Sequence, residues 1–358
     1  MAEMSSAKRK WSTVRAVLAQ LSFDVWYLMV GILLLFPFLI SLLSGQSVEQ
    51  GAPKFFQGLL IQTFIFAVYA MSYDLLMGFT GILSFGHALF FGSGAYFVAI
   101  GLKHLKWPFP AAVGLVVVVA VLLSLLIGVL SLRVRGVYFA MVTLAFAQVA
   151  FLLATATDFK QWTGAEDGLQ GIPVPAIISP TDNRLRFYYI ALAFAGLMYV
   201  LARRIVNSPT GRVFVAIREN ENRATMIGYN ILLYKVIALV ISGVLAALAG
   251  LLNALWNLNA TPTVLSIDTT IDALLMTIIG GVGTLVGPML GAGVLTLLGY
   301  WLNATFGRSW LLILGIIYVA LVLFLPYGLV GTWRTRRVGW GGWRELLSRY
   351  RISSSREG

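Results

Sequence analysis

Three ionisable residues stand inside long apolar stretches of this sequence, namely Asp74, His87 and Asp272. Such a side chain is costly in the hydrocarbon of a bilayer, so it is first considered as a group that binds a solute, passes an ion or carries a proton. For Asp74 the alternative is a carboxylate that accepts hydrogen bonds from backbone freed by a broken helix. For His87 the alternative is a structural hydrogen bond. One histidine and two aspartates are too few to support a proton-coupled pump.

The first two of these residues belong to a glycine-rich segment, residues 74–94. It contains Gly78, Gly81, Gly86, Gly92 and Gly94, with Thr80 and Ser84 among them. Each glycine weakens a helix by about 1 kcal/mol relative to alanine. Small residues permit close helix packing, whereas a broken helix exposes backbone groups along a transport path. For the cluster from Thr80 to His87 we expect a broken or re-entrant segment.

A second glycine-rich segment covers residues 272–293. It contains Gly280, Gly281, Gly283, Gly287, Gly291 and Gly293, together with Pro288. One constant shift aligns Leu75, Leu76, Met77, Gly81, Gly92 and Gly94 with Leu274, Leu275, Met276, Gly280, Gly291 and Gly293. Paired glycine-interrupted segments indicate a transport path. The expected topology puts the first at an inner turn and starts the second from the outer side, so either the repeat is a coincidence or one span is misplaced.

The loop over residues 205–235 is the most informative polar piece. Ser208 followed by Pro209 predicts a capped helix start. A second short helix is expected from Glu221 to Ile227, because the glutamate favours its N-terminus and Gly228 suits its C-terminal end. Two defined caps favour a docking surface for a partner, and the alternative is a solvated linker.

The composition excludes a soluble globular protein. Of 358 residues, 59% are hydrophobic and only 11% are charged, whereas soluble proteins carry about 25% charged residues. The absence of cysteine excludes disulfides and thiolate metal sites, and a metal site, a cofactor or a catalytic set is not expected. No lysine follows a glycine, so the chain lacks a phosphate-binding loop and cannot hydrolyse ATP by that motif.

These observations predict an all-α integral membrane protein with about ten transmembrane helices. A spanning helix needs about 20 mostly apolar residues. The expected spans are Val25–Ser44, Leu59–Met77, Leu83–Gly101, Ala111–Leu130, Tyr138–Thr157, Phe187–Ala202, Val236–Asn257, Thr270–Met289, Leu290–Phe306 and Trp310–Pro326.

The distribution of basic residues sets the expected orientation. Most of the 26 Lys and Arg residues fall in segments that ten spans would place on one side, which predicts that both termini are cytoplasmic. This also accounts for the net charge of +12 without nucleic acid. The expected organisation is a basic N-terminus over residues 1–24, a transmembrane domain over 25–330 and a basic tail over 331–358.

Four motifs in order give the sequence a resemblance. The stretches Gly78–Tyr96, Leu132–Phe146, Ser208–Tyr234 and Ile279–Gly293 resemble the M-type (LivM-like) permease subunit of branched-chain amino acid ABC importers. The similarity covers roughly residues 55 to 325.

The resemblance implies the ABC importer permease fold and a subunit without ATPase activity in the inner membrane of a bacterium. Its expected partners are an H-type second permease, two nucleotide-binding ATPase subunits and a periplasmic substrate-binding protein. Glu221, Ala224 and Gly228 fit the pattern by which such permeases engage their ATPases, and Arg218, Glu219 and Arg223 would add charge pairs.

The resemblance further implies alternating access along a path lined by the glycine-broken segments. The candidate path residues are Asp74, Thr80, Gly81, Ser84, His87, Tyr138, Thr143, Gly280, Gly281 and Gly283. The expected substrate is a branched-chain amino acid. Urea or another small polar solute is the alternative, and an ion-coupled secondary transporter is a further one.

Overall fold

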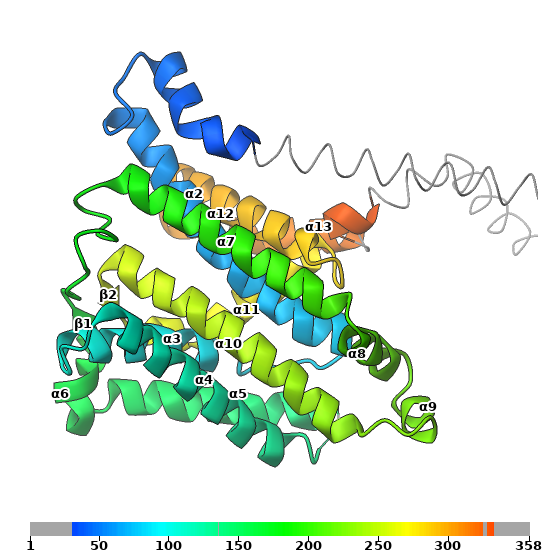
Figure 1. Cartoon of the computed structure of the whole chain (residues 1–358). Coiled ribbons are helices and arrows are strands. Elements are labelled where there is room, and N and C mark those ends of the chain that lie inside the picture. The colour runs from blue at the N-terminus through cyan, green and yellow to red at the C-terminus, as the bar shows by residue number, and fades with distance from the viewer. Residues whose placement is uncertain (1–30, 135, 325–327, 333–358) are drawn as a thin grey trace, which may run out of the picture.

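The computed structural model describes residues 31–134, 136–324 and 328–332. The predicted basic N-terminus and nearly all of the predicted basic tail lie outside these ranges. Figure 1 shows long helices running roughly side by side, with α8 and α9 at one end of the bundle and the short strands at the other.

Among the described residues, six helices are long and apolar enough to cross a membrane. They are α2 (Gly51–Asp74) with its π-helical continuation η1 (Leu75–Phe79), α4 (Phe109–Ser131), α5 (Val137–Thr155), α7 (Arg184–Val206), α10 (Ile231–Asn257) and α12 (Val286–Phe306). The structure is therefore mostly helical with six candidate membrane spans, because each of these helices has the length that a bilayer requires.

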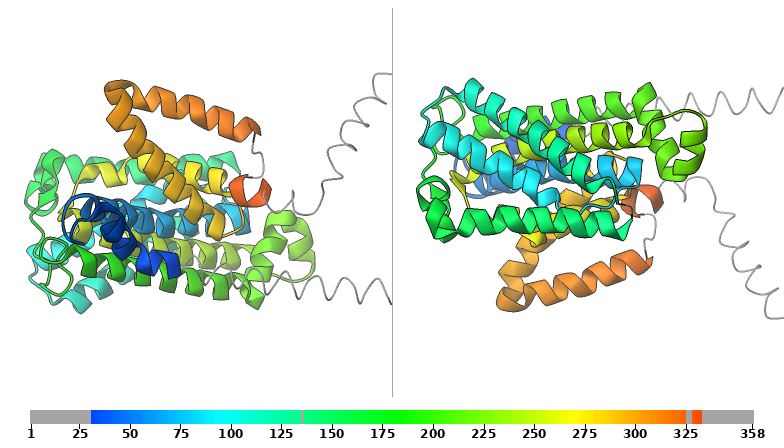
Figure 2. Two further views of the ribbon diagram at one scale, coloured as in Figure 1. Left: turned by 90° about the horizontal axis from the view of Figure 1, so that it is seen from above. Right: turned by 90° about the horizontal axis from the view of Figure 1, so that it is seen from below.

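The count of about ten spans is not confirmed by helix length. The remaining apolar helices are shorter, and they are Gly31–Ser44, α3 (His87–Lys103), α11 (Ile267–Gly280) and α13 (Trp310–Phe324). Figure 2 shows that the C-terminal part of α12 and the helix α13 reach outward from the rest of the bundle. The sidedness of the termini stays a prediction.

The boundary predicted between Met289 and Leu290 is wrong. The helix break comes earlier, because α11 ends at Gly280 and α12 begins at Val286. Gly281 and Gly283 have φ values of 119° and 77°, and residues that carry a side chain rarely adopt such backbone conformations. Pro288 lies in the first turn of α12, where a missing N–H costs no helical hydrogen bond.

The earlier break also bears on where the two glycine-rich segments lie. The first segment is broken between η1 and α3, as the glycine pattern predicts, and the second between α11 and α12. Both breaks lie against Arg218 of α8 (Pro209–Glu219), so they share one end of the molecule. The predicted eighth span was therefore misplaced at its C-terminal end, while the internal repeat itself stays a prediction.

Short elements complete the chain. At the end opposite α8 and α9 (Glu221–Met226), β1 (Leu169–Gln170) pairs antiparallel with β2 (Asn259–Ala260). The connecting turns are η2 (Thr157–Phe159), α6 (Lys160–Thr163), η3 (Ala165–Asp167), η4 (Pro262–Leu265) and η5 (Gly307–Ser309).

The core lies where α10 packs on α3 and α4, and where α2 packs on α7 and α12. Tyr69, Phe90 and Phe91 are among its largest fully buried side chains. A Cβ on Gly94 would overlap the carbonyl oxygen of Ala247. The glycines of the first segment therefore serve both predicted roles, because some allow close packing of α3 on α10 and others break the helix.

Candidate functional site

Helix α8 is a capped amphipathic helix at one end of the bundle. The Ser208 Oγ accepts a hydrogen bond from the Gly211 N–H at 3.3 Å, and Pro209 occupies the first turn. Val213, Phe214 and Ile217 are buried, so one face of the helix packs on the bundle and the other is left to solvent.

Helix α9 follows at once and is capped at both ends. The Asn220 Oδ1 accepts from the Arg223 N–H at 3.0 Å. Ala224 is buried in a small cluster with side chains of α8. Gly228 has a φ of 97° just after the helix, which is the conformation that a C-terminal glycine permits. The predicted helix pair is confirmed as local structure, with α9 ending at Met226.

An ion pair fastens α9 to the following long helix. The Lys235 Nζ lies 2.6 Å from the Glu221 Oε1, with the Lys235 side chain 11% exposed and the Glu221 side chain 32% exposed. The pair joins the start of α9 to the first turns of α10, so the orientation of α9 is coupled to that of a core helix.

Arg218 connects α8 to both glycine-broken segments. Its Nη1 donates a short hydrogen bond to the Gly78 carbonyl oxygen. A Cβ on Gly81 would lie 3.1 Å from the Arg218 Cγ, and one on Gly283 would lie 3.0 Å from its Nη1. The absence of side chains at these glycines therefore leaves room for the Arg218 side chain to lie close to the backbone of both breaks.

Asp74 joins the two glycine-broken segments to each other. Its Oδ1 accepts from the Gly283 N–H at 2.6 Å, and its Oδ2 accepts from the Leu285 N–H at 3.0 Å. The carboxylate is fully buried. It therefore satisfies two backbone donors of the loop between α11 and α12. Asp74 is thus a carboxylate that accepts hydrogen bonds from backbone freed by a helix break.

His87 lies in a packed aromatic setting at the start of α3. Its Nε2 lies 2.9 Å from the Ser72 Oγ, and its ring is stacked on Tyr69 and edge-on to Tyr73. Its Nδ1 has no hydrogen-bond partner among the described residues. The side chain is fully buried, which fits a structural hydrogen bond better than a group that meets solvent.

The other predicted path residues of this region make internal hydrogen bonds. Thr80 donates to the Leu76 carbonyl oxygen, and the Ser84 Oγ accepts from the N–H two residues later at 3.3 Å. The Thr143 Oγ1 accepts from the Phe85 N–H at 3.2 Å, which ties α5 to the first break. All three side chains are buried.

The structure brings most of the predicted residues together but not all. A Cβ on Gly280 would overlap the Gly287 carbonyl oxygen, so this glycine allows α11 and α12 to meet. Tyr138 lies apart on α5 with 72% of its surface exposed. Asp272 is half-buried on α11, and among the described residues no cluster could hold a metal ion.

Sequence reasoning missed three residues that hold this site. Asn220 could have been found, because an asparagine directly before an acidic helix start is a common cap. Lys235 and Leu285 gave no local signal. Their roles depend on Glu221 and Asp74, which are distant in the sequence.

The sequence of this chain is similar to those of known membrane proteins. The profile described as "Branched-chain amino acid transport system / permease component" matches residues 55–325. The high-affinity branched-chain amino acid transport system permease protein LivM of Escherichia coli (strain K12) is 26% identical over 293 residues, covering 75% of this chain and 68% of the relative.

Two further relatives show the range of the similarity. The probable branched-chain amino acid transport permease protein LivM of Methanocaldococcus jannaschii is 24% identical, over 74% of this chain and 90% of the relative. The ribose import permease protein RbsC of Haemophilus influenzae is 25% identical, over 78% and 88%. No solved structure matches this chain. Since the profile covers most of the sequence and the helices suit a membrane, the chain belongs to the family of permease components of branched-chain amino acid transport systems.

Proposed function

We propose that this chain is a permease subunit of an ATP-driven importer for branched-chain amino acids. The observation that carries the proposal is the capped pair α8–α9, held by Arg218 against the backbone of both glycine-broken segments. The proposed partners are an H-type permease, two ATPase subunits and a periplasmic binding protein, in the inner membrane of a bacterium.

The outer face of α8–α9 is suited to a protein partner. Met226 and Ile227 are 85% and 75% exposed, and Glu219 and Arg223 are exposed beside them. An apolar tip flanked by charges is typical of an interface. We assign this face to the ATPases, with Glu219, Glu221, Arg223, Ala224 and Gly228 forming or shaping it.

The proposed coupling passes through Arg218. Movement of α8 on ATP binding would displace Gly78 and, through Asp74, the loop at Gly283. One displacement would then act on the breaks before α3 and before α12. An ATP-bound state shifts the permease only when it favours one permease conformation over the other.

The proposed path runs beside this cluster. Thr80, Ser84, His87 and Thr143 are buried and bonded within the chain. In this proposal they set the backbone of the breaks, while the exposed Tyr138 faces the path. Gly81, Gly280, Gly281 and Gly283 allow the breaks to change shape.

The identity of the transported substrate is a separate part of the proposal. The LivM relatives support a branched-chain amino acid, while the ribose permease and the autoinducer 2 import permeases LsrC favour a different small polar solute as the second candidate. Uptake of radiolabelled leucine, ribose and urea by cells carrying the complete system decides between them. ATP-independent uptake by the purified chain alone in vesicles would contradict the importer proposal.

The role of α8–α9 is tested by reversing its ion pair. Glu221→Lys is expected to lower uptake at least about tenfold, because two like charges then meet where the pair was. The double variant Glu221→Lys with Lys235→Glu restores the pair. If uptake returns, Glu221 acts by positioning α9. If only folding returns, Glu221 contacts the ATPase.

Two controls keep this test specific. Asn222→Lys introduces the same cationic side chain at an exposed position of α9 and measures any general effect of a new cation. Co-purification of the ATPases with each variant reports docking directly. Unchanged uptake and unchanged co-purification for Glu221→Lys would contradict the docking proposal.

A further inference from the structure

A cleft of about 440 Å³ is lined by residues near the starts of α2 and α7 and at the end of α10. In Figure 1 these helix ends lie opposite α8 and α9. Its lining includes Lys54 of α2, Arg184 of α7, and Trp256 and Asn257 of α10. The volume is in the range of small-molecule sites. None of the residues assigned to coupling or to the path belongs to it.

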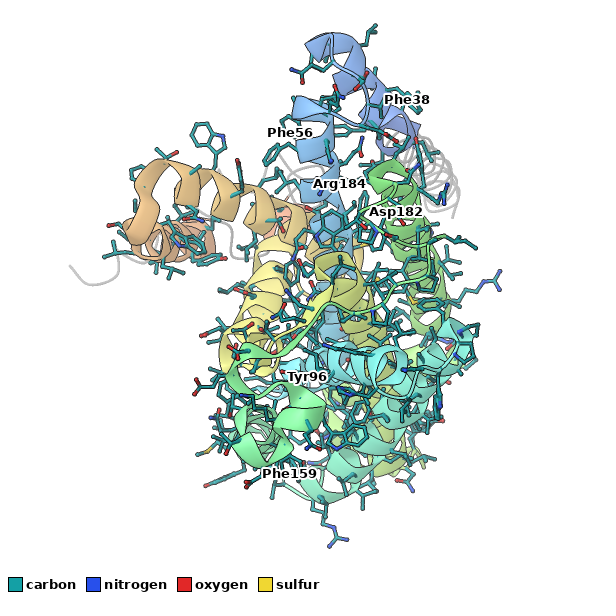
Figure 3. All side chains as sticks on the ribbon, turned by 90° about the vertical axis from the view of Figure 1, so that its left-hand side faces the viewer. Phe38, Phe56, Tyr96, Phe159, Asp182 and Arg184 are labelled. Atoms are coloured by element: carbon teal, nitrogen blue, oxygen red, sulfur yellow. The ribbon has the colours of Figure 1, made fainter. Side chains whose placement is uncertain are left out.

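The cleft has one strongly positive wall. Arg184 donates from its Nη1 to the Lys54 carbonyl oxygen at 3.3 Å, and its guanidinium lies over the Trp256 ring, 5.2 Å from the centroid. Figure 3 shows Arg184 and Asp182 in the part of the molecule where α7 begins. Among the described residues, neither Lys54 nor Arg184 forms an ion pair with a carboxylate, Asp182 included.

The two cations stand where the helix dipoles already favour an anion. Lys54 is in the first turn of α2 and Arg184 begins α7, and neither first turn holds an acidic residue. A cation at a helix N-terminus is unfavourable unless an anion accompanies it. The Arg184 Nε is also buried without an acceptor among the described residues, which leaves a charged donor unsatisfied.

The part of the lining that comes from the end of α10 has the reverse character. Helix α10 ends at this cleft with no basic residue in its last turn, so its carbonyl end carries partial negative charge. The Asn257 Nδ2 donates to Asn253, which leaves the Asn257 Oδ1 to accept from a ligand. A carboxylate beside the two cations and an ammonium group beside the end of α10 match the two charged groups of an amino acid.

We propose that this cleft binds the free amino acid on its way into the permease, with the carboxylate held by Arg184 and Lys54. The carboxylate subsite follows from the charges alone, while the choice of an amino acid rests on the proposed function. The guanidinium fork offers a carboxylate parallel hydrogen bonds that an ammonium group cannot.

Labelling of one cysteine tests the proposal. The chain has no cysteine of its own, and Thr181 lines the cleft and is exposed. In the assembled transporter without its binding protein, we expect L-leucine to slow maleimide labelling of Thr181→Cys. L-Leucinamide, which lacks the carboxylate, is expected to protect far less, and acetate at higher concentration is expected to protect.

Charge removal then identifies the subsite. Arg184→Gln and Lys54→Gln are each expected to raise the half-protecting leucine concentration about tenfold or more. Arg186→Gln is the matched control, because Arg186 is an exposed cation on the same first turn of α7 that does not line the cleft. If Arg184→Gln reduces folding, the exposed Lys54 still supplies the test.

Three outcomes would overturn the inference. Absence of protection by leucine, equal protection by leucinamide, or equal loss in Arg186→Gln would each do so. Should Arg184→Gln weaken only the response to added binding protein, the cations serve an acidic side chain of that protein instead. Leucine uptake by the unmodified transporter tests the proposed function separately, and acetate protection tests the carboxylate subsite whatever the substrate.

Discussion

The two ends of the bundle use their charged groups in opposite ways. At the α8–α9 end, Asp74 accepts from two backbone N–H groups and Glu221 forms an ion pair with Lys235. At the other end, Arg184 and Lys54 have no carboxylate partner among the described residues. Charged groups that are paired within the chain hold the structure, whereas cations without a carboxylate partner are candidates for a ligand.

The largest expected effect is the loss of the Asp74 carboxylate. Asp74→Ala leaves the Gly283 and Leu285 N–H groups buried without an acceptor, so we expect a loss of about 3 kcal/mol in stability. Asp74→Asn keeps one acceptor oxygen and is expected to lose less. Thermal unfolding of the detergent-solubilised chain measures both losses. An unchanged midpoint for Asp74→Ala would mean that the Asp74 carboxylate does not hold the loop between α11 and α12.

A smaller loss is expected from Gly280→Ala. The new Cβ overlaps the Gly287 carbonyl oxygen, and such overpacking costs about 1–3 kcal/mol. Gly196→Ala in α7 is the control, because no atom lies within 4 Å of a Cβ there and alanine favours a helix. The same thermal measurement compares them, and equal midpoints would show that α11 and α12 do not meet closely.

Arg218→Ala is expected to reduce transport more than stability. It removes a charged donor from the Gly78 carbonyl oxygen, a loss of about 1.5–3 kcal/mol in that contact. Uptake should fall while the ATPases still co-purify. Arg212→Ala, an exposed position of the same helix, should leave uptake unchanged. Loss of co-purification in Arg218→Ala would instead place this arginine in the docking face.

The smallest perturbation tests whether the two ends face opposite sides of the membrane. Thr181→Cys at the cleft and Asn222→Cys on α9 are both exposed and should scarcely affect stability. An impermeant maleimide added outside intact cells should label only Thr181→Cys. Labelling of both or of Asn222→Cys alone would refute the orientation on which the comparison rests.

Of the two helix breaks, one could be predicted from the local sequence pattern and the other could not. The break before α3 was predictable because its glycines interrupt the apolar run, and the structure confirms it. The boundary at Met289–Leu290 was wrong because the residues around Val286 remain apolar, so hydropathy does not mark the turn. The positive φ values of Gly281 and Gly283 decide it.

Some features of the candidate site could likewise be predicted from the sequence, and others could not. Ser208, Pro209, Glu221 and Gly228 were identified from cap chemistry, and the structure forms both helices there. The grouping of Tyr138 with the buried path candidates could not be judged from sequence. Its side chain is exposed, because the face of α5 that it occupies turns away from the core.

The sequence by itself determined that the chain is a helical membrane protein with a capped pair α8–α9. These features depend on composition and on caps within a few residues. Only the tertiary structure decided that Asp74 holds a loop 209 positions away and that Arg184 meets Lys54 and Trp256. Such contacts depend on how distant helices pack, because hydrogen bonds and close approach require atoms within a few ångströms of one another.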